Sequence, residues 1–165
     1  MGPLMKCVIL SHSFGVRLKK CPHFEPCDFK RGLEFFVDGR GGLTIKDVII
    51  YREFWLRMLN DSNSRRTDHV VLDLVNNQLC SVEENPDSIL NDLSYLIHYI
   101  LEKYSEIKVH IMLTTPRLPK GLKKTKKTAV QYNTEADEVN IRLKGLEDTF
   151  PGNVKIICRQ KIHCK

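Results

Sequence analysis

The alternation of strand-like and helix-like segments constrains this chain more than any other feature. Five short apolar runs have the length of buried strands, at residues 4–10, 33–37, 70–74, 109–114 and 154–158. Segments with helical spacing, or with room for a short helix, separate these runs. The resulting β-α-β-α-β-α-β-α-β order predicts a three-layer α/β/α domain built on a five-stranded parallel sheet.

Helix signals support this order. Residues 13–20 have room for two helical turns, and another helix is expected from about 128 to 147. Thr44 and Asp47 resemble a capping box that opens a helix after the second strand. The clearest periodic signal follows Asn85, a suitable cap, and its apolar stripe consists of Ile89, Leu93, Leu96, Ile97, Ile100, Leu101 and Tyr104.

Length and composition indicate a single domain, residues 1–165. With 42% hydrophobic and 28% charged residues, the chain can bury a core and keep a hydrated surface. No run reaches the roughly 18–20 apolar residues of a membrane span, and the N-terminus does not resemble a signal peptide. The six cysteines lie mostly in or beside strand-like segments, which favours a reduced, intracellular and cytoplasmic protein.

Three residues between the first two strands are conceivable zinc ligands: Cys21, His23 and Cys27. Their spacing matches no compact zinc knuckle, and a fourth ligand is not apparent. We therefore expect reduced cysteines in a loop, with no metal and no cofactor.

The net charge of +6 is concentrated in residues 117–127, which contain six basic residues and no acid. Such a block attracts phosphates electrostatically. One expectation is therefore a nucleic-acid contact, and the alternative is a solvated loop. The lysines concerned are Lys120, Lys123, Lys124, Lys126 and Lys127.

Three consecutive strand ends carry groups suited to acyl transfer. Ser13 follows the first strand, Gly41-Gly42 follows the second, and Asn77 follows the third. In a parallel α/β sheet these loops gather at one edge. A serine nucleophile requires a base and preorganised donors for the oxyanion, and a glycine N–H and an asparagine side chain can be such donors. Each residue also has a structural reading, as a helix cap, an ordinary turn or a loop contact.

These motifs resemble those of the SGNH (GDSL-type) hydrolases, whose fold is flavodoxin-like. Residues 9–14 are similar to the first block, in which the catalytic serine follows Gly-Asp or, in one metazoan branch, Gly-His. Residues 41–44 and 70–79 are similar to the second and third blocks. The resemblance covers nearly the whole chain and is closest to SGNH-like domains of animal genomes, including retrotransposon-encoded ones. It implies Ser13 as nucleophile, with Gly42 and Asn77 forming the oxyanion hole.

Some positions depart from the family pattern. Ser11 and Val75 replace glycines of the first and third blocks, and Gln78 replaces an aspartate. A β-branched residue at position 75 is unfavourable if that turn requires positive φ.

The catalytic base is the largest departure. The family's Asp-x-x-His block lies beyond the last strand, but only seven residues follow Cys158 and none is acidic. His163 is the one histidine there, a weak candidate for a base and expected to be a solvated terminal residue. His12 adjoins Ser13, and its side chain is expected to point elsewhere.

Other functions of α/β domains fit poorly. The first strand end has no Rossmann glycine fingerprint, and Asp73 lies inside its strand rather than at a phosphoacceptor position. Two hypotheses remain. One is an ancestral serine esterase, acting on small acyl esters, whose activity is weakened or lost. The other is a non-catalytic interaction module that binds a partner or nucleic acid through residues 117–127. The sequence indicates neither the acyl group nor the oligomeric state.

Overall fold

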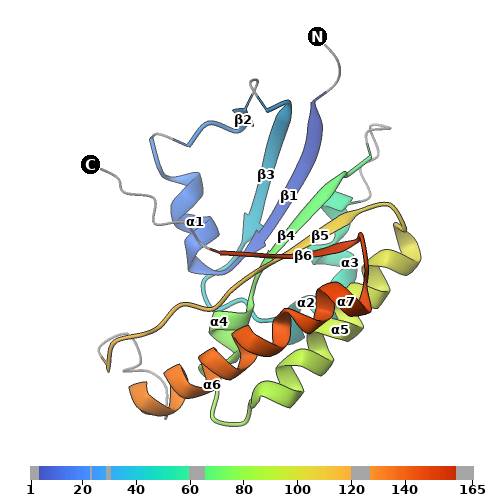
Figure 1. The fold of residues 1–165 in the computed structure, drawn as a ribbon. Coiled ribbons are helices and arrows are strands. Elements are labelled where there is room, and N and C mark those ends of the chain that lie inside the picture. The colour runs from blue at the N-terminus through green and yellow to red at the C-terminus, as the bar shows by residue number, and fades with distance from the viewer. Residues whose placement is uncertain (1–3, 23, 29–30, 60–65, 120–126, 159–165) are drawn as a thin grey trace.

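The central element of the domain is a six-stranded sheet with the order β2-β3-β1-β4-β5-β6 (Figure 1). The computed structural model describes residues 4–22, 24–28, 31–59, 66–119 and 127–158. Every strand pairing is parallel except that of β2 with β3. The strands are β1 (Met5–Ser11), β2 (Cys27–Asp28), β3 (Leu33–Gly39), β4 (His69–Asp73), β5 (Lys108–Met112) and β6 (Val154–Ile157). The predicted α/β fold is confirmed, with one more strand than expected, because the two-residue β2 is too short to show a periodicity.

The observed starts of the helices agree with the prediction from the sequence better than their ends do. They are α1 (Ser13–Lys19), α2 (Ile45–Ile50), α3 (Arg52–Trp55), the 3-10 turn η1 (Arg57–Leu59), α4 (Val75–Gln78), α5 (Pro86–Lys103), α6 (Ala129–Leu143) and α7 (Gly145–Thr149). Both predicted helix starts, at Thr44 and Asn85, are capping boxes. The helix expected to open at Thr44 is broken at Tyr51, where ψ is 38°, although apolar residues at helical spacing continue to Leu59. The helix expected to about 147 is divided at Lys144, before Gly145. In the described ranges, no helix combines the length and apolar character needed to cross a membrane.

The direction of the connections explains how the helices are distributed over the sheet. The β1-α1-β3 connection moves toward one sheet edge, whereas the connections from β3 to β4, β4 to β5 and β5 to β6 move toward the other. Because such crossovers are right-handed, α1 lies on one face, and α2, α5 and α6 lie on the opposite face. Figure 1 shows this arrangement, with α5 and α6 side by side.

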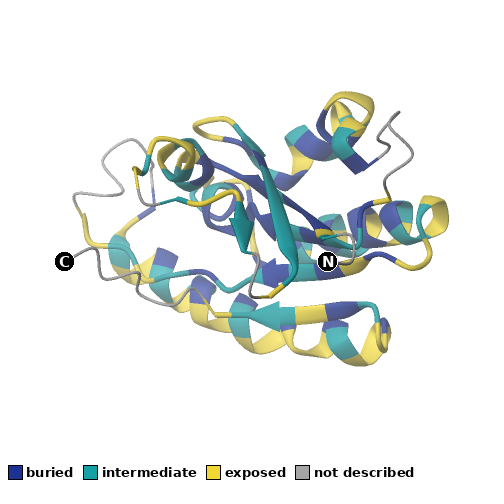
Figure 2. Cartoon of the chain, turned by 90° about the horizontal axis from the view of Figure 1, so that it is seen from above, coloured by how far each residue is buried: buried dark blue, intermediate teal, exposed yellow. Residues whose placement is uncertain are grey.

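The core lies between the sheet and the larger helical layer (Figure 2). Alternate residues of three central strands are fully buried there: Val8, Leu10, Val70, Leu72, Val109 and Ile111, all 0% exposed. They share one cluster with the buried stripe of α5, as the helical spacing predicts. Each Å² of apolar surface buried on folding contributes about 25 cal/mol, so this layer is the main source of stability. The strand ends that carry the candidate site therefore extend from a packed platform.

Candidate active site

The turns after β1, β3 and β4 begin at the same edge of the sheet, because the last residues of these strands are in register. Ser11, the last residue of β1, is in register with Gly39 at the end of β3 and with Asp73 at the end of β4. A Cβ atom at position 39 would lie 1.9 Å from the Ser11 carbonyl oxygen. Glycine at this position therefore allows the end of β3 to approach the end of β1.

Ser13 is the first residue of α1, and it is exposed. Its hydroxyl oxygen lies 3.1 Å from Nδ1 of His12. His12 is only 3% exposed. The expectation that the His12 side chain points away from Ser13 is therefore wrong. His12 is the N-cap of α1, with φ −75° and ψ −142°, and the non-helical backbone turns its ring inward instead of outward from the helix.

A buried polar cluster, consisting of Ser11, His12 and Asp73, lies beneath Ser13. The Nε2 atom of His12 is 3.6 Å from Oδ1 of Asp73, which is 1% exposed. The Ser11 hydroxyl donates to Oδ2 of Asp73 at 2.7 Å and accepts from the Gly15 backbone N–H at 3.1 Å. Ser11, which stands at a glycine position of the resembled motif, thus connects β1, β4 and α1.

Gly42 and Asn77 belong to two adjoining turns. Gly42 has φ +82°, which favours glycine, and a Cβ atom there would meet nothing within 4 Å. The Asn77 side chain donates from Nδ2 to the Leu43 carbonyl at 3.3 Å. Its Oδ1 accepts from Nη2 of Arg117 at 3.4 Å. Arg117 therefore orients the Asn77 amide so that its N–H side faces the Gly42 turn.

The other departures from the family pattern have structural roles. Val75 is buried and begins α4 in helical conformation, so no positive φ is required of this β-branched residue. Oε1 of Gln78 accepts from the Lys46 backbone N–H at 3.1 Å. Its Nε2 donates to Asp92 at 2.6 Å and to Glu84 at 3.3 Å. Gln78 thus ties the start of α2 to the first half of α5.

Asn76, next to Asn77, connects α4 to α6 and to the segment after β5. Its Oδ1 accepts from the Tyr132 hydroxyl at 2.9 Å and from the Thr115 backbone N–H at 3.1 Å. None of Asn76, His12, Asp73 and Arg117 was predicted from the sequence as a residue of this site. Position beside the serine could have indicated His12, whereas Asp73 was expected inside its strand and instead ends β4. No local signal indicates Arg117, since its partner is 40 residues away.

The basic segment is described only at its ends. Lys120, Lys123, Lys124 and Lys126 lie outside the described residues, as do His163 and His23. Lys127 is 3% exposed, and its ammonium group donates to the Glu84 carbonyl at 2.8 Å and pairs with Glu135. Lys127 therefore joins α6 to the segment that precedes α5 and does not project toward solvent.

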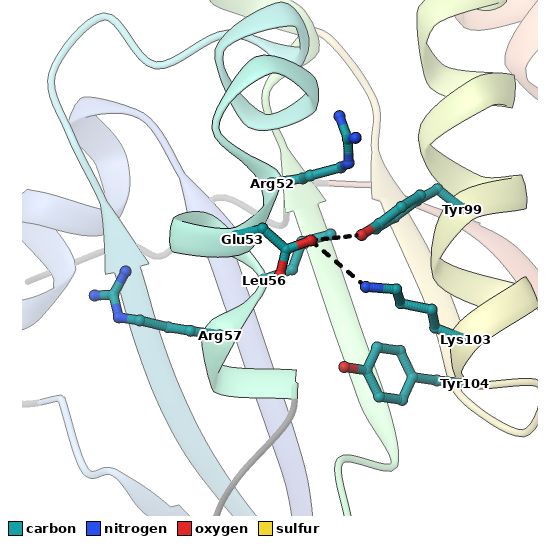
Figure 3. A pocket seen from close by; sticks show the side chains of 7 residues that line it. All are labelled: Arg52, Glu53, Leu56, Arg57, Tyr99, Lys103 and Tyr104. Carbon is teal, nitrogen blue, oxygen red and sulfur yellow. Dashed lines mark hydrogen bonds and ion pairs between the residues drawn. The ribbon is translucent and has the colours of Figure 1, made fainter.

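A hollow elsewhere on the surface is lined by residues of α3, η1 and α5, and by Leu56 and Tyr104 (Figure 3). Within it the Tyr99 hydroxyl donates to the Glu53 carboxylate at 3.1 Å, and Lys103 pairs with the same carboxylate at 3.6 Å. Arg52 lies over the Tyr99 ring, 5.3 Å from its centroid. These groups satisfy one another and hold α3 against α5. The chemistry suggested by the sequence thus lies at the strand ends and not in this hollow.

Comparison with solved structures identifies the fold. No protein-family model matches this chain, and no curated protein matches its sequence. A GDSL-like lipase from Bacteroides thetaiotaomicron superposes with a TM-score of 0.67 at 14% identity, over 93% of this chain and 67% of that one. A lipolytic protein of the G-D-S-L family from Veillonella parvula gives 0.63 at 20% identity, over 93% and 77%. An acetyl xylan esterase gives 0.60 at 15% identity, over 93% and 77%.

These similarities show the SGNH-hydrolase fold, with its flavodoxin-like sheet. The chain spans about two thirds to three quarters of the length of these three structures.

Proposed function

We propose that this domain is a serine acyl hydrolase that cleaves small acyl esters. Ser13 is the nucleophile, and the Gly42 backbone N–H and the Asn77 side chain are the oxyanion donors. The observation that carries the proposal is the exposed Ser13 hydroxyl at the edge where β1, β3 and β4 end level. The lipases and the esterase of the same fold make this chemistry the natural one for the site.

The oxyanion donors are supported by two features of the turns. The open space beside Gly42 leaves room for a carbonyl oxygen next to its N–H. The contact of Asn77 with the Leu43 carbonyl brings its amide to the residue that follows Gly42. Removal of one oxyanion donor from an acyl-transfer enzyme typically costs about 10²–10³ in kcat, so two such donors are a large part of the available catalysis.

Turnover requires a base for Ser13 in addition to these donors. Loss of a triad member typically lowers kcat by about 10⁴–10⁶. The proposed activity is therefore tested with a reagent that detects a single covalent reaction of Ser13, not with substrate turnover alone.

A fluorophosphonate probe provides that test. We expect wild-type protein to be labelled at Ser13, with the adduct assigned by peptide mass spectrometry, and the variant Ser13→Ala to be unlabelled. Ser105→Ala, which removes another exposed serine hydroxyl far along the chain, is the matched control and retains the label. Absence of Ser13 labelling in folded wild type, or equal labelling of Ser13→Ala, contradicts the proposal. Such a result would favour the non-catalytic module instead.

A further inference from the structure

The group beneath Ser13 has the composition of a general base and its partner. His12 presents Nδ1 to the Ser13 oxygen at 3.1 Å, and Nε2 to Oδ1 of Asp73 at 3.6 Å. Nε2 is buried and has no hydrogen-bond partner among the residues that the structure describes. A buried polar atom without a partner typically costs about 1–3 kcal/mol, so its placement against a carboxylate requires an explanation.

We propose that His12 is the general base for Ser13 and that Asp73 is its positioning residue. This inference rests on the proposed hydrolase function. It assigns the role of the Asp-x-x-His block of the resembled family to a histidine adjoining the serine and to an aspartate at the end of β4.

The tautomer argument follows from the two contacts. Asp73 Oδ1 is the acceptor nearest to Nε2 in the contacts described, so the proton of neutral His12 belongs on Nε2. Nδ1 then carries the lone pair, and Ser13 donates its hydroxyl proton to it. The 3.6 Å separation is that of an ion pair and must shorten by about half an ångström to form a good hydrogen bond. Catalytic hydrogen bonds are often long before substrate binds, and they tighten as charge develops.

The network around Asp73 supports a fixed position for this carboxylate. Its Oδ2 accepts from the Ser11 hydroxyl at 2.7 Å, and its Oδ1 lies 3.6 Å from Nε2 of His12. The other charged groups at this corner have partners of their own. Asp38 of β3 pairs with Arg57 and, more loosely, with Lys19, at 3.0 Å and 4.0 Å. Arg117 contacts Asn77 and the Tyr132 ring. Among the contacts described, Asp73 is a charged group that faces the imidazole.

The reaction balances with water as the second substrate. The Ser13 proton passes to His12 Nδ1 while Oγ forms a bond to the ester carbonyl carbon, and the carbonyl π electrons move to oxygen. When the carbonyl re-forms, the bond to the leaving alkoxide breaks, and the alkoxide takes the proton from Nδ1. Water then gives a proton to Nδ1 and attacks the acyl group. Ser13 leaves with that proton, releasing the acid. Asp73 stabilises the transient imidazolium through Nε2–H and is not itself protonated.

The test is the pH dependence of Ser13 labelling by a fluorophosphonate. In wild type we expect the second-order rate constant to rise with pH in a single step that depends on His12. His12→Gln should lose this pH-dependent step. At pH values above the step, its Ser13 should be labelled about 10²–10⁴-fold more slowly than in wild type. Asp73→Asn, which keeps the imidazole but presents an amide in place of the carboxylate, should also label at least 10²-fold more slowly. His98→Gln replaces an exposed histidine of α5 and should match wild type.

The outcomes separate this inference from the proposed function. Labelling of Ser13 with an unchanged rate and pH step in His12→Gln overturns the role of His12 and leaves the hydrolase proposal standing. No labelling of wild type overturns both. Nitrogen NMR of the wild-type imidazole provides a readout that needs no variant to fold. We expect the proton on Nε2 at pH 8, and a proton on Nδ1 at that pH would also overturn the inference.

Discussion

At the scale of single residues, Ser11 explains why the first motif of this chain departs from the resembled pattern. A glycine at position 11 could not connect Asp73 to the backbone of α1, whereas the serine hydroxyl contacts both. The surrounding space is restricted, since a Cβ atom at Gly15 would lie 2.9 Å from the Ser11 Cβ. The Ser11 side chain and Gly15 therefore form a matched pair, and together they hold the turn that presents Ser13.

Cys7 offers a test of burial at the same scale. The Cys7 side chain is 5% exposed in β1, and burial raises the pKa of its thiol from 9.0 to about 11. Because the thiolate is the reactive form, two pKa units reduce the reactive fraction at pH 8 by about 100-fold. We expect Cys158, which is exposed, to be alkylated by iodoacetamide at pH 8 well before Cys7. Peptide mass spectrometry over time measures both rates, and equal rates in the folded protein would contradict the described burial.

The sequence indicates which residues follow the strand ends better than it indicates their contacts. Ser13, Gly42 and Asn77 could be placed because strand ends and glycine turns are local features. Their catalytic roles stay predictions. The His12 ring could not be placed, since its position depends on the N-cap backbone and on Asp73 in another strand. The contact of Arg117 with Asn77 likewise depends on the packing of distant segments.

At the scale of elements, helix starts were predictable and helix interruptions were not. The capping boxes at Thr44 and Asn85 are read from four consecutive residues. The interruption at Tyr51 has no such local code, because the apolar spacing continues through it to Leu59. The two-residue β2 was also missed, since it is defined by pairing of Cys27 with Glu34 and not by its own pattern.

The cap of α5 gives the prediction at this scale. Oδ1 of Asn85 accepts from the Ser88 backbone N–H at 3.0 Å, and the Ser88 hydroxyl accepts from the Asn85 N–H at 3.1 Å. We expect Asn85→Ala to lower the free energy of unfolding by about 1 kcal/mol, because the Ser88 backbone N–H loses its side-chain acceptor. Asn91→Ala, at an exposed position within the same helix, is the control.

Chemical denaturation of both variants measures the difference. Alanine is the better helix former, so Asn91→Ala should be neutral or slightly stabilising. A destabilisation of Asn91→Ala equal to that of Asn85→Ala would show that the capping contacts do not stabilise α5.

At the scale of the whole molecule, the topology brings the site together. The order of strands and helices was sufficient to predict a parallel sheet, and the right-handed crossovers then determine which face each helix covers. The central position of β1, between β3 and β4, brings the turns after these three strands to one edge. This is the place where open α/β sheets bind ligands. Which side chains converge there could not be deduced from the order of elements, because it depends on the register and on the close approach at Gly39.

The central claim is that Ser13 attacks the carbonyl carbon of an ester while Gly42 and Asn77 donate hydrogen bonds to the oxygen of the same carbonyl. A crystal structure of the protein phosphonylated on Ser13 tests this most directly, since the phosphonyl oxygen occupies the position of the oxyanion. We predict this oxygen within about 3 Å of both the Gly42 backbone nitrogen and Nδ2 of Asn77. A phosphonyl oxygen that points to solvent, with either donor too distant for a hydrogen bond, would contradict the account.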